Sequence, residues 1–372
     1  MVNRDKTGRG CGMELSECSG FENCGAMPRG PSETVPGHVE IYQVDAFTDV
    51  VFGGNPAGVV PFARGLTADS MQKIAREMNL SETAFVVDLR RHGTGASREV
   101  VEHGSCVSPD FEVRFFTPVS EVDLCGHATI GTFWLLAELG LIGPKVAARA
   151  EKGSILGSDE EIRVYQGTGA GVLPVDLLWG CEGVPSRVMM TQNLPEVSFQ
   201  LDGPELQELE QILGAPKGSV ASSGKVKPQA VSTGLLDLIV PVTSLEALLS
   251  MRPDMACLSQ FCQEKKVISV HCFSMNTMDS ASTVHCRDFA PAVGIPEESA
   301  TGTASGAAGA YLVLNRLVDI KEPVTRIICE QGHIMKRPSV IHVEIGVEGG
   351  NIVSVRVGGS AVTVMNGVMR VL

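Results

Sequence analysis

Glu82 stands where a helical pattern ends and an apolar strand begins, in the run NLSETAF at residues 79–85. A carboxylate at the entry to an apolar strand is costly to bury in its charged form. Glu82 could therefore hold a proton near neutrality and act as a general acid or base. The alternative is an exposed glutamate in a turn, and the pattern leaves both interpretations open.

A thiol and an imidazole flank a glycine at a second place, Cys125-Gly126-His127, where a helical pattern begins. A helix N-terminus favours a thiolate, so Cys125 could serve as a nucleophile or base, and His127 could donate a hydrogen bond to a substrate. A small buried thiol without a chemical role is the alternative. The corresponding residue later in the chain is Thr301, so the sequence offers no matching pair of thiols.

An internal repeat organises the elements around these residues. The motif RFFTP at 114–118 recurs as RDFAP at 287–291, and each copy follows an alternating strand pattern. An acidic stretch follows each copy, and then a Gly-x-Ala segment that opens a helix, at 126–129 and again at 302–305. The same order of features twice predicts two lobes of one topology, with roughly 165 residues each once the N-terminal segment is set aside.

The two predicted helix starts have a chemical consequence. Glycine and alanine leave backbone N–H groups bare at a helix N-terminus, where the helix dipole adds partial positive charge. Two lobes that face each other would direct the starts at Gly126 and Gly302 into one cleft, which could bind a small carboxylate without any arginine. Close packing of helix against strand is the other explanation for such small residues.

Three parts of the chain are expected. Residues 1–37 have few bulky apolar side chains and are expected to form a disordered extension, residues 38–165 an N-terminal lobe, and residues 166–372 a C-terminal lobe whose last strand could return to the first lobe. In the first lobe the patterns predict strands at 39–47, 53–60, 82–87 and 111–116, helices at 67–78 and 126–139, and a long loop at 88–110. The glycine-rich run 167–171 is predicted to be a hairpin turn, because Pro174 follows it.

Composition excludes several classes of function. Lys plus Arg number 30 and Asp plus Glu number 43, and a net charge of −13 makes binding of nucleic acid improbable. No apolar run reaches the roughly 18 residues that a membrane-spanning helix needs. The 11 cysteines include no Cys-x-x-Cys pair, which indicates reduced thiols and a cytoplasmic protein.

Long ordered motifs resemble the PhzF-like family of phenazine biosynthesis. They include MQKIAREMNLSETAF and FEVRFFTPVSEVDLCGHATIG in the first half, and RDFAPAVGI, ATGTASG and QGHIMKRPS in the second. The resemblance covers about residues 39–372. It implies an α+β fold similar to that of diaminopimelate epimerase, in which two lobes each wrap a β-sheet around a central helix. It further implies an isomerase with a biosynthetic role, without cofactor or metal, that is commonly a homodimer and acts on a small carboxylate such as a dihydro-hydroxyanthranilate.

The resemblance also implies roles for particular residues. Glu82 corresponds to the family's acid/base glutamate, and Glu298 corresponds to its aspartate, with His127 positioned beside the substrate. The substrate would be bound by Ser81, Gly126, Gly302 and Thr303. This chain departs from the family pattern at Glu298, Ser299 and Thr303. One extra methylene at Glu298 moves a carboxylate by about an ångström, and a misplacement of that size can cost about 100-fold in rate.

Four functions follow as hypotheses. The first is a cofactor-independent isomerase in which Glu82 takes a proton from one carbon of a small unsaturated carboxylic acid and returns it at another. The second is a racemase that uses two thiols, and the third is a hydroxyproline dehydratase that pairs Cys125 with Thr301. The fourth is a binding or scaffold protein that kept the fold and lost turnover.

Overall fold

The computed structural model describes residues 37–90, 100–102, 105–144, 160–180, 185–220 and 226–371. The extension expected at residues 1–37 lies outside this part of the chain except for Gly37. The described residues form a mixed α/β structure with strands of one large sheet system around two central helices. The predicted α+β class is confirmed.

The first lobe is formed by the first half of the chain. Its elements are β1 (His38–Ala46), β2 (Asn55–Val60), α1 (Ala68–Met78), β3 (Thr83–Asp88), β4 (Val100–Glu102), β5 (Ser105–Val107), β6 (Phe111–Phe116), β7 (Glu121–Val122), α2 (Gly126–Glu138), β8 (Glu160–Thr168), β9 (Gly171–Trp179) and β10 (Pro185–Gln192). The short β4–β5 pair lies in the segment expected to be a loop. The predicted hairpin turn after residue 167 joins β8 to β9, as the register of Thr168 with Gly171 shows.

The second half of the chain forms the second lobe and supplies a last strand that pairs with β1 of the first lobe. Its elements are β11 (Glu196–Gln200), α3 (Gly203–Ile212), β12 (Gln229–Ser232), β13 (Leu236–Val242), α4 (Leu245–Ser250), α5 (Met255–Lys265), β14 (Ser269–Ser274), β15 (Val284–Ala290), a 3-10 turn (Pro291–Val293), β16 (Ile295–Glu298), α6 (Gly302–Leu314), β17 (Val324–Gln331), β18 (Ser339–Glu348), β19 (Asn351–Gly359) and β20 (Ala361–Arg370). The described helices include none long and apolar enough to cross a bilayer.

Strand pairing repeats from lobe to lobe. In the first lobe β6 pairs antiparallel with β3 and β7 and parallel with β8. In the second lobe β15 pairs antiparallel with β14 and β16 and parallel with β17. The repeated motifs at Arg114 and Arg287 fall in the two equivalent strands, β6 and β15. The duplication predicted from the sequence is therefore present in the pairing of the strands.

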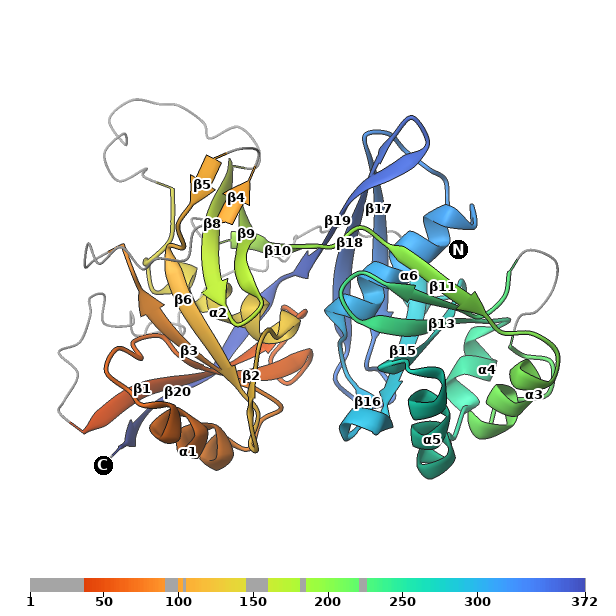
Figure 1. The fold of residues 1–372 in the computed structure, drawn as a ribbon, viewed down its shortest axis with the longest axis horizontal. Coiled ribbons are helices and arrows are strands. Elements are labelled where there is room, and N and C mark those ends of the chain that lie inside the picture. The colour runs from red at the N-terminus through yellow and green to blue at the C-terminus, as the bar shows by residue number, and fades with distance from the viewer. Residues whose placement is uncertain are drawn as a thin grey trace, which may run out of the picture. The chain divides into compact units, whose positions relative to one another are not determined.

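Each repeat ends in a strand that joins the other lobe. β11 follows β10 along the chain but pairs with β12, whereas β20 follows β19 and pairs with β1 (Figure 1). β10 and β19, the strands before these crossings, pair with each other. β8 runs through the expected boundary between residues 165 and 166. The exact division into lobes stays a prediction, and the two halves of the chain share strands.

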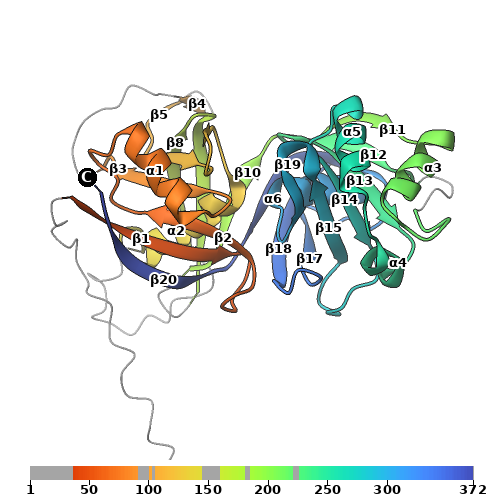
Figure 2. The ribbon, with the colours of Figure 1, turned by 90° about the horizontal axis from the view of Figure 1, so that it is seen from below.

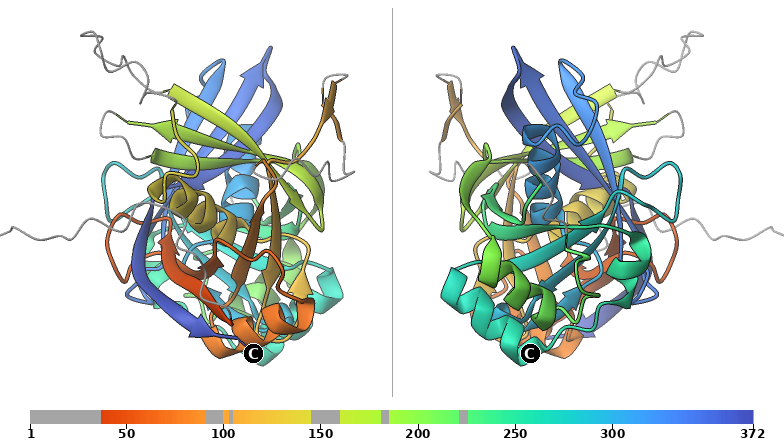
Figure 3. Two further views of the ribbon diagram at one scale, coloured as in Figure 1. Left: turned by 90° about the vertical axis from the view of Figure 1, so that its left-hand side faces the viewer. Right: turned by 90° about the vertical axis from the view of Figure 1, so that its right-hand side faces the viewer.

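The two central helices are buried almost all round, as expected for helices that are apolar on every side. α2 packs against β1, β2, β10 and β20, and α6 packs against β12, β13, β18 and β19. Small residues in α6 permit this close approach, since a Cβ atom on Gly309 would lie 2.7 Å from Val343 Cγ1. In the views of Figures 2 and 3, α1 lies outside the strands of the first lobe and α3, α4 and α5 lie outside those of the second.

Candidate active site

The end of α1 and the start of β3 position Glu82. Thr67 caps the start of α1 by accepting a hydrogen bond from the Ser70 N–H, and Asn79 ends the helix in a left-handed conformation. The chain then turns sharply, and the Glu82 carbonyl accepts from the Gly58 N–H of β2 before β3 begins. The Glu82 side chain is 15% exposed, so the alternative of an exposed turn glutamate is wrong.

His127, in the first turn of α2, lies directly against Glu82. Its Nε2 is 3.3 Å from Glu82 Oε2 and 3.3 Å from Ser81 Oγ, while its Nδ1 is 3.5 Å from Cys125 Sγ. Burial lowers the pKa of His127, against the opposing effect of the Glu82 charge, so the imidazole is neutral at pH 7. A neutral imidazole can donate one hydrogen bond and accept another beside the carboxylate.

Glu298 reaches the same imidazole from the second lobe. Its Oε1 lies 3.9 Å from His127 Nδ1. Asn55, at the start of β2, donates its side-chain N–H to Glu298 Oε1 at 2.9 Å and also to the Ala300 carbonyl at 2.9 Å. Burial raises the pKa of Glu298 to about 8, with a further contribution from the Asp288 carboxylate. The site therefore holds one acidic group from each lobe, on two sides of one neutral histidine.

Cys125 is the N-cap residue of α2, with its thiol against the ring of His127. Burial raises the pKa of its thiol well above the ordinary value, and the Glu82 and Glu298 carboxylates raise it further. Burial and the nearby carboxylates thus oppose the thiolate that the partial positive charge of the helix end would favour. Cys125 is a neutral thiol beside the two glutamates.

The remaining expected substrate-binding residues occupy the two helix starts. A Cβ atom on Gly126 would meet no described protein atom within 4 Å, so space is open above the start of α2. A Cβ atom on Gly302 would lie 3.3 Å from Phe47 Cζ, so this start is more closely packed. The Gly302 carbonyl accepts from Gln192 Nε2, and the Thr303 carbonyl accepts from Thr233 Oγ1. Room for a ligand is therefore clearest at Gly126.

Glu82, Cys125 and His127 could be considered as a metal site, because one ligand atom from each lies within 4.8 Å of the others. The two nitrogens of His127 face different partners, however, with Nε2 toward Glu82 and Nδ1 toward Cys125. A shared ion would need one nitrogen to point at the ion together with both other ligands. The arrangement fits a hydrogen-bonding cluster, and we assign no metal to it.

Several residues of the site were not found by sequence reasoning. Asn55 joins the lobes, and Asp237 and Asp288 lie behind Glu298 in strands β13 and β15. A signal was available for Asp237, an acid inside the otherwise apolar run LDLIVPV at 236–242, whereas Asp288 follows Arg287 in the recurring motif RDFAP. Nothing local distinguishes Asn55, because its partner Glu298 is 243 residues away in the chain.

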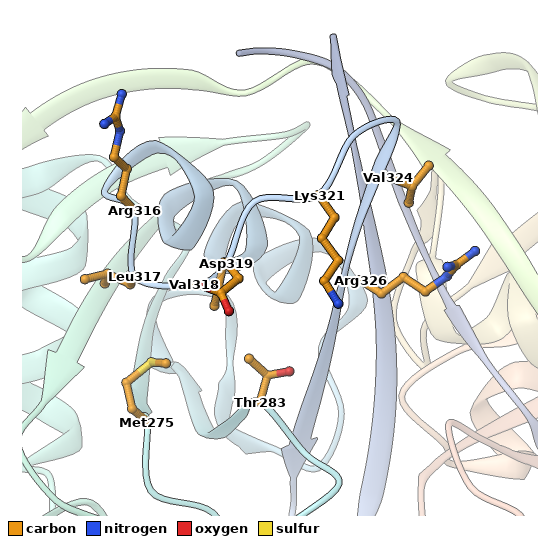
Figure 4. A pocket seen from close by; sticks show the side chains of 9 residues that line it. All are labelled: Met275, Thr283, Arg316, Leu317, Val318, Asp319, Lys321, Val324 and Arg326. Carbon is orange, nitrogen blue, oxygen red and sulfur yellow. The ribbon is translucent and has the colours of Figure 1, made fainter. Parts of the chain in front are cut away.

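A hollow of about 550 Å³ lies elsewhere in the second lobe and shares no lining residue with this cluster (Figure 4). Its lining includes Arg316, Asp319, Lys321 and Arg326. Arg326 is paired with Glu344 at 3.2 Å, and the guanidinium groups of Arg316 and Arg326 lie at opposite edges of the hollow (Figure 4). The candidate active site remains the cluster of Glu82, Cys125, His127 and Glu298.

Comparisons with known proteins agree with this assignment of fold and class. The family described as phenazine biosynthesis-like protein matches residues 44–367. An uncharacterized isomerase of Clostridium acetobutylicum is 36% identical over 324 residues, which are 87% of this chain and 95% of that protein. Other curated relatives are likewise named isomerases, which agrees with the isomerase class predicted from the sequence.

Solved structures show the same fold. A phenazine biosynthesis protein of the PhzF family from Bacillus anthracis has a TM-score of 0.73 and 28% identity, covering 89% of this chain and 99% of its own. A hydroxyproline epimerase from Agrobacterium vitis, with bound trans-4-hydroxy-L-proline, has a TM-score of 0.53 at 14% identity, covering 90% of this chain and 91% of its own, which shows similarity of fold alone. From residue 44 to residue 367, this chain belongs to the PhzC-PhzF family of phenazine biosynthesis-like proteins.

Proposed function

We propose that the protein is a cofactor-independent isomerase that moves a proton along a small unsaturated carboxylic acid, with Glu82 as the general acid/base. One observation carries the proposal: Glu82 and Glu298, from different lobes, flank the neutral imidazole of His127 at 3.3 and 3.9 Å. A pair of carboxyl groups in different environments is the arrangement that lets one group accept a proton while the other donates.

In this mechanism the substrate carboxylate binds the backbone N–H groups at the start of α2, where the space above Gly126 is open. Glu82 removes a proton from one carbon and returns it to another, so that no net proton enters or leaves. His127 and Glu298 hold polar groups of the substrate during the transfer. Proton transfer by a positioned side chain contributes typically about 100- to 10,000-fold in rate.

The thiol mechanisms have less support in the site. A racemase or a dehydratase of that type needs Cys125 as a thiolate, whereas burial raises the pKa of this thiol well above its ordinary value. The hydroxyl of Thr301, the proposed partner of Cys125, lies 3.2 Å from Asp288 Oδ2 and 3.1 Å from Glu298 Oε2. A binding or scaffold protein would keep the anion site and lack proton transfer.

Two measurements test the proposal. Thermal shift with a panel of small cyclic and amino carboxylates identifies ligands, since a ligand at 100 times its dissociation constant adds about 2.7 kcal/mol of stability. Each ligand is then incubated with the protein in deuterated water and examined for deuterium at carbon. We expect exchange at two carbon positions of a bound unsaturated acid. Tight binding without exchange for every ligand would contradict the isomerase and favour a binding protein.

We further infer that the protein acts in the cytoplasm, in a biosynthetic reaction and as a homodimer. The cytoplasmic inference rests on the thiols: Cys125, Cys257, Cys262, Cys272, Cys286 and Cys329 are free, although Cys286 and Cys329 lie on paired strands. The homodimer rests on the family resemblance and is tested by light scattering on the purified chain. A monomer at micromolar concentration would contradict it.

A further inference from the structure

A row of polar side chains crosses four neighbouring strands behind Glu298. Asp237 of β13 is in register with Ser269 of β14, and His271 of β14 is in register with Asp288 of β15. Asp288 is in turn in register with Glu298 at the end of β16. Apart from Glu298, each of these side chains is at most 2% exposed. This row of mainly acidic side chains therefore leads from the candidate active site into the core of the second lobe.

Two hydroxyl groups link the three carboxyl groups of this row. The Ser269 hydroxyl lies 2.9 Å from Asp237 Oδ1 and 2.8 Å from Asp288 Oδ1. The Thr301 hydroxyl lies 3.2 Å from Asp288 Oδ2 and 3.1 Å from Glu298 Oε2. A hydroxyl carries one hydrogen and can donate to only one of its two neighbours. If all three carboxyl groups were ionised, one oxygen–oxygen contact at each hydroxyl would lack a hydrogen, which is costly in a buried site.

Two protons added to the carboxyl groups would give each of the four hydroxyl–carboxyl contacts a hydrogen. The geometry indicates which carboxyl groups carry them. Asp288 is central: it can accept from both hydroxyls, and it faces His271 Nδ1 at 3.0 Å, so it is the carboxyl best able to stay ionised. Asp237 and Glu298 stand at the two ends, where a protonated carboxyl donates to the adjacent hydroxyl. The pKa directions agree, because burial and the Asp288 charge raise the pKa of both end groups.

We propose that Asp288 is a positioning residue which, as the ionised centre of the chain Asp237–Ser269–Asp288–Thr301–Glu298, holds Glu298 as a carboxylic acid that faces the substrate. The use of this acid rests on the proposed function. When substrate binds, the Glu298 proton turns from the Thr301 oxygen toward the negative charge that develops as Glu82 removes a proton from carbon. If that proton is transferred, it returns to Glu298 as Glu82 delivers its own proton to the second carbon. If Glu298 gives up the proton, the Thr301 hydroxyl turns from Asp288 to donate to the new carboxylate.

The first lobe shows that the fold does not need this polar row for packing. Strand register places Ala57, Ala84, Phe115 and Val122 at the positions that Asp237, His271, Asp288 and Glu298 occupy in the second lobe. The same helix-against-sheet arrangement is thus filled by apolar side chains in one lobe and by acids in the other. Burying charge is unfavourable unless it is paired, so the acids require a reason other than stability.

Other titratable groups face this row of carboxyl groups from every adjacent element, and they bear on the titration of Glu298. The thiols among them have raised pKa values and are neutral at pH 7, which leaves Asp288 and Glu82 as the main charges acting on Glu298. The full set of titratable groups that face the row is Glu82, Cys125 and His127 from the first lobe, Cys262 on α5, Cys272 on β14, Cys286 on β15, and the Arg287–Glu297 ion pair.

The test is an infrared titration of the carboxylic acid C=O band in the protein without any ligand. Subtraction of the Glu298→Gln spectrum identifies the Glu298 band. In Asp288→Asn the titration of Glu298 should move to lower pH by roughly one unit or more, because a neighbouring like charge is removed. Asp237→Asn is the matched control: an amide donates as the protonated carboxyl does, so the titration of Glu298 should stay near that of the parent.

Thr301 provides a second pair of variants. Thr301→Val keeps the shape but removes the hydroxyl that stabilises the Glu298 carboxylate, so the titration should move to higher pH, whereas Thr301→Ser should leave it in place. Opposite shifts in Asp288→Asn and Thr301→Val are not expected of residues with only a structural role. Equal shifts from both aspartate variants, or shifts in one direction for Asp288→Asn and Thr301→Val, would overturn the proposal.

If Asp288→Asn does not fold, the Thr301 pair decides alone, and an unchanged titration in Thr301→Val overturns the proposal. Because no substrate is present, these outcomes are independent of the proposed isomerase. Titration shifts as expected, without deuterium exchange, would support the role of Asp288 in holding Glu298 protonated and would contradict the proposed isomerase.

Discussion

Glu82 and Ser269 occupy equivalent positions in the two lobes. Glu82 immediately precedes the first residue of β3 that pairs with β6, and Ser269 immediately precedes the first residue of β14 that pairs with β15. Only the first lobe therefore presents a carboxylate here, while the second lobe has a hydroxyl that links Asp237 to Asp288. The duplicated fold has become chemically asymmetric at its centre. Such asymmetry suits a reaction in which one group accepts a proton and a different group donates.

The first prediction separates carboxylate chemistry from thiol chemistry. Glu82→Gln keeps the size and hydrogen bonding of the side chain but cannot transfer a proton, so exchange of deuterium into the ligand should fall by at least about 100-fold while binding survives. Cys125→Ser should cost less than about tenfold, because the neutral thiol has no required step. Exchange that persists in Glu82→Gln and disappears in Cys125→Ser would reverse the assignment.

A second prediction concerns the start of α2. Gly126→Val should fold like the parent, because its Cβ atom points into open space, but should lose carboxylate binding by at least tenfold in thermal shift titrations. Gly309→Val is the control for packing: its Cβ atom would lie 2.7 Å from Val343 Cγ1, so it should lower the melting temperature instead. A Gly126→Val protein that folds and still binds would exclude the helix start as the anion site.

The pH dependence of stability gives a third prediction. The pKa of Glu298 is about 8 in the folded protein against an ordinary value of 4.5, so the folded state binds the proton more tightly than the unfolded state. Its contribution to stability is complete below about pH 4.5 and is lost as the pH rises toward 8 and above.

Melting temperatures of Glu298→Gln and the parent, measured from pH 5 to pH 9, test this. The stability of the parent relative to the variant should fall as the pH rises, while the exposed control Glu348→Gln should follow the parent throughout. Parallel curves for Glu298→Gln and the parent would show that Glu298 titrates normally.

Much of the fold could be predicted from periodicity. β6 has the expected bounds Phe111–Phe116, and α2 begins at Gly126 as expected and ends at Glu138, one residue early. Local patterns determine such elements because apolar spacing specifies them directly. The recurrence of the motif around Arg114 at Arg287 also predicted the duplicated topology.

The site was harder to predict because its contacts are distant in sequence. Asn55 and Glu298 come together only when both lobes are formed, and no local spacing announces that pair. The protonation of Cys125 stayed open for a related reason: helix position is visible in the sequence, but burial beside two carboxylates is not. Local chemistry predicted which residues could react, and tertiary packing decided their protonation.

The last prediction uses the duplication as its own control. Arg114 forms a two-bonded ion pair with Glu121, and the equivalent Arg287 forms the same pair with Glu297. The first pair is partly exposed, with side chains 31% and 45% accessible, whereas the second is buried, at 5% and 16%. Arg287 also donates to two backbone carbonyls, those of Leu248 and Met251.

Arg287→Met should therefore lower the free energy of unfolding by about 3–5 kcal/mol, because it leaves a buried carboxylate and two carbonyls without their partner. Arg114→Met should cost at most about 1 kcal/mol, as is usual for exposed pairs in which water replaces the lost bonds. Chemical denaturation of the two variants measures both values, and the double variant Arg287→Met with Glu297→Gln should recover part of the larger loss. Equal costs at the two sites would show that burial of the second pair is not what gives it its strength.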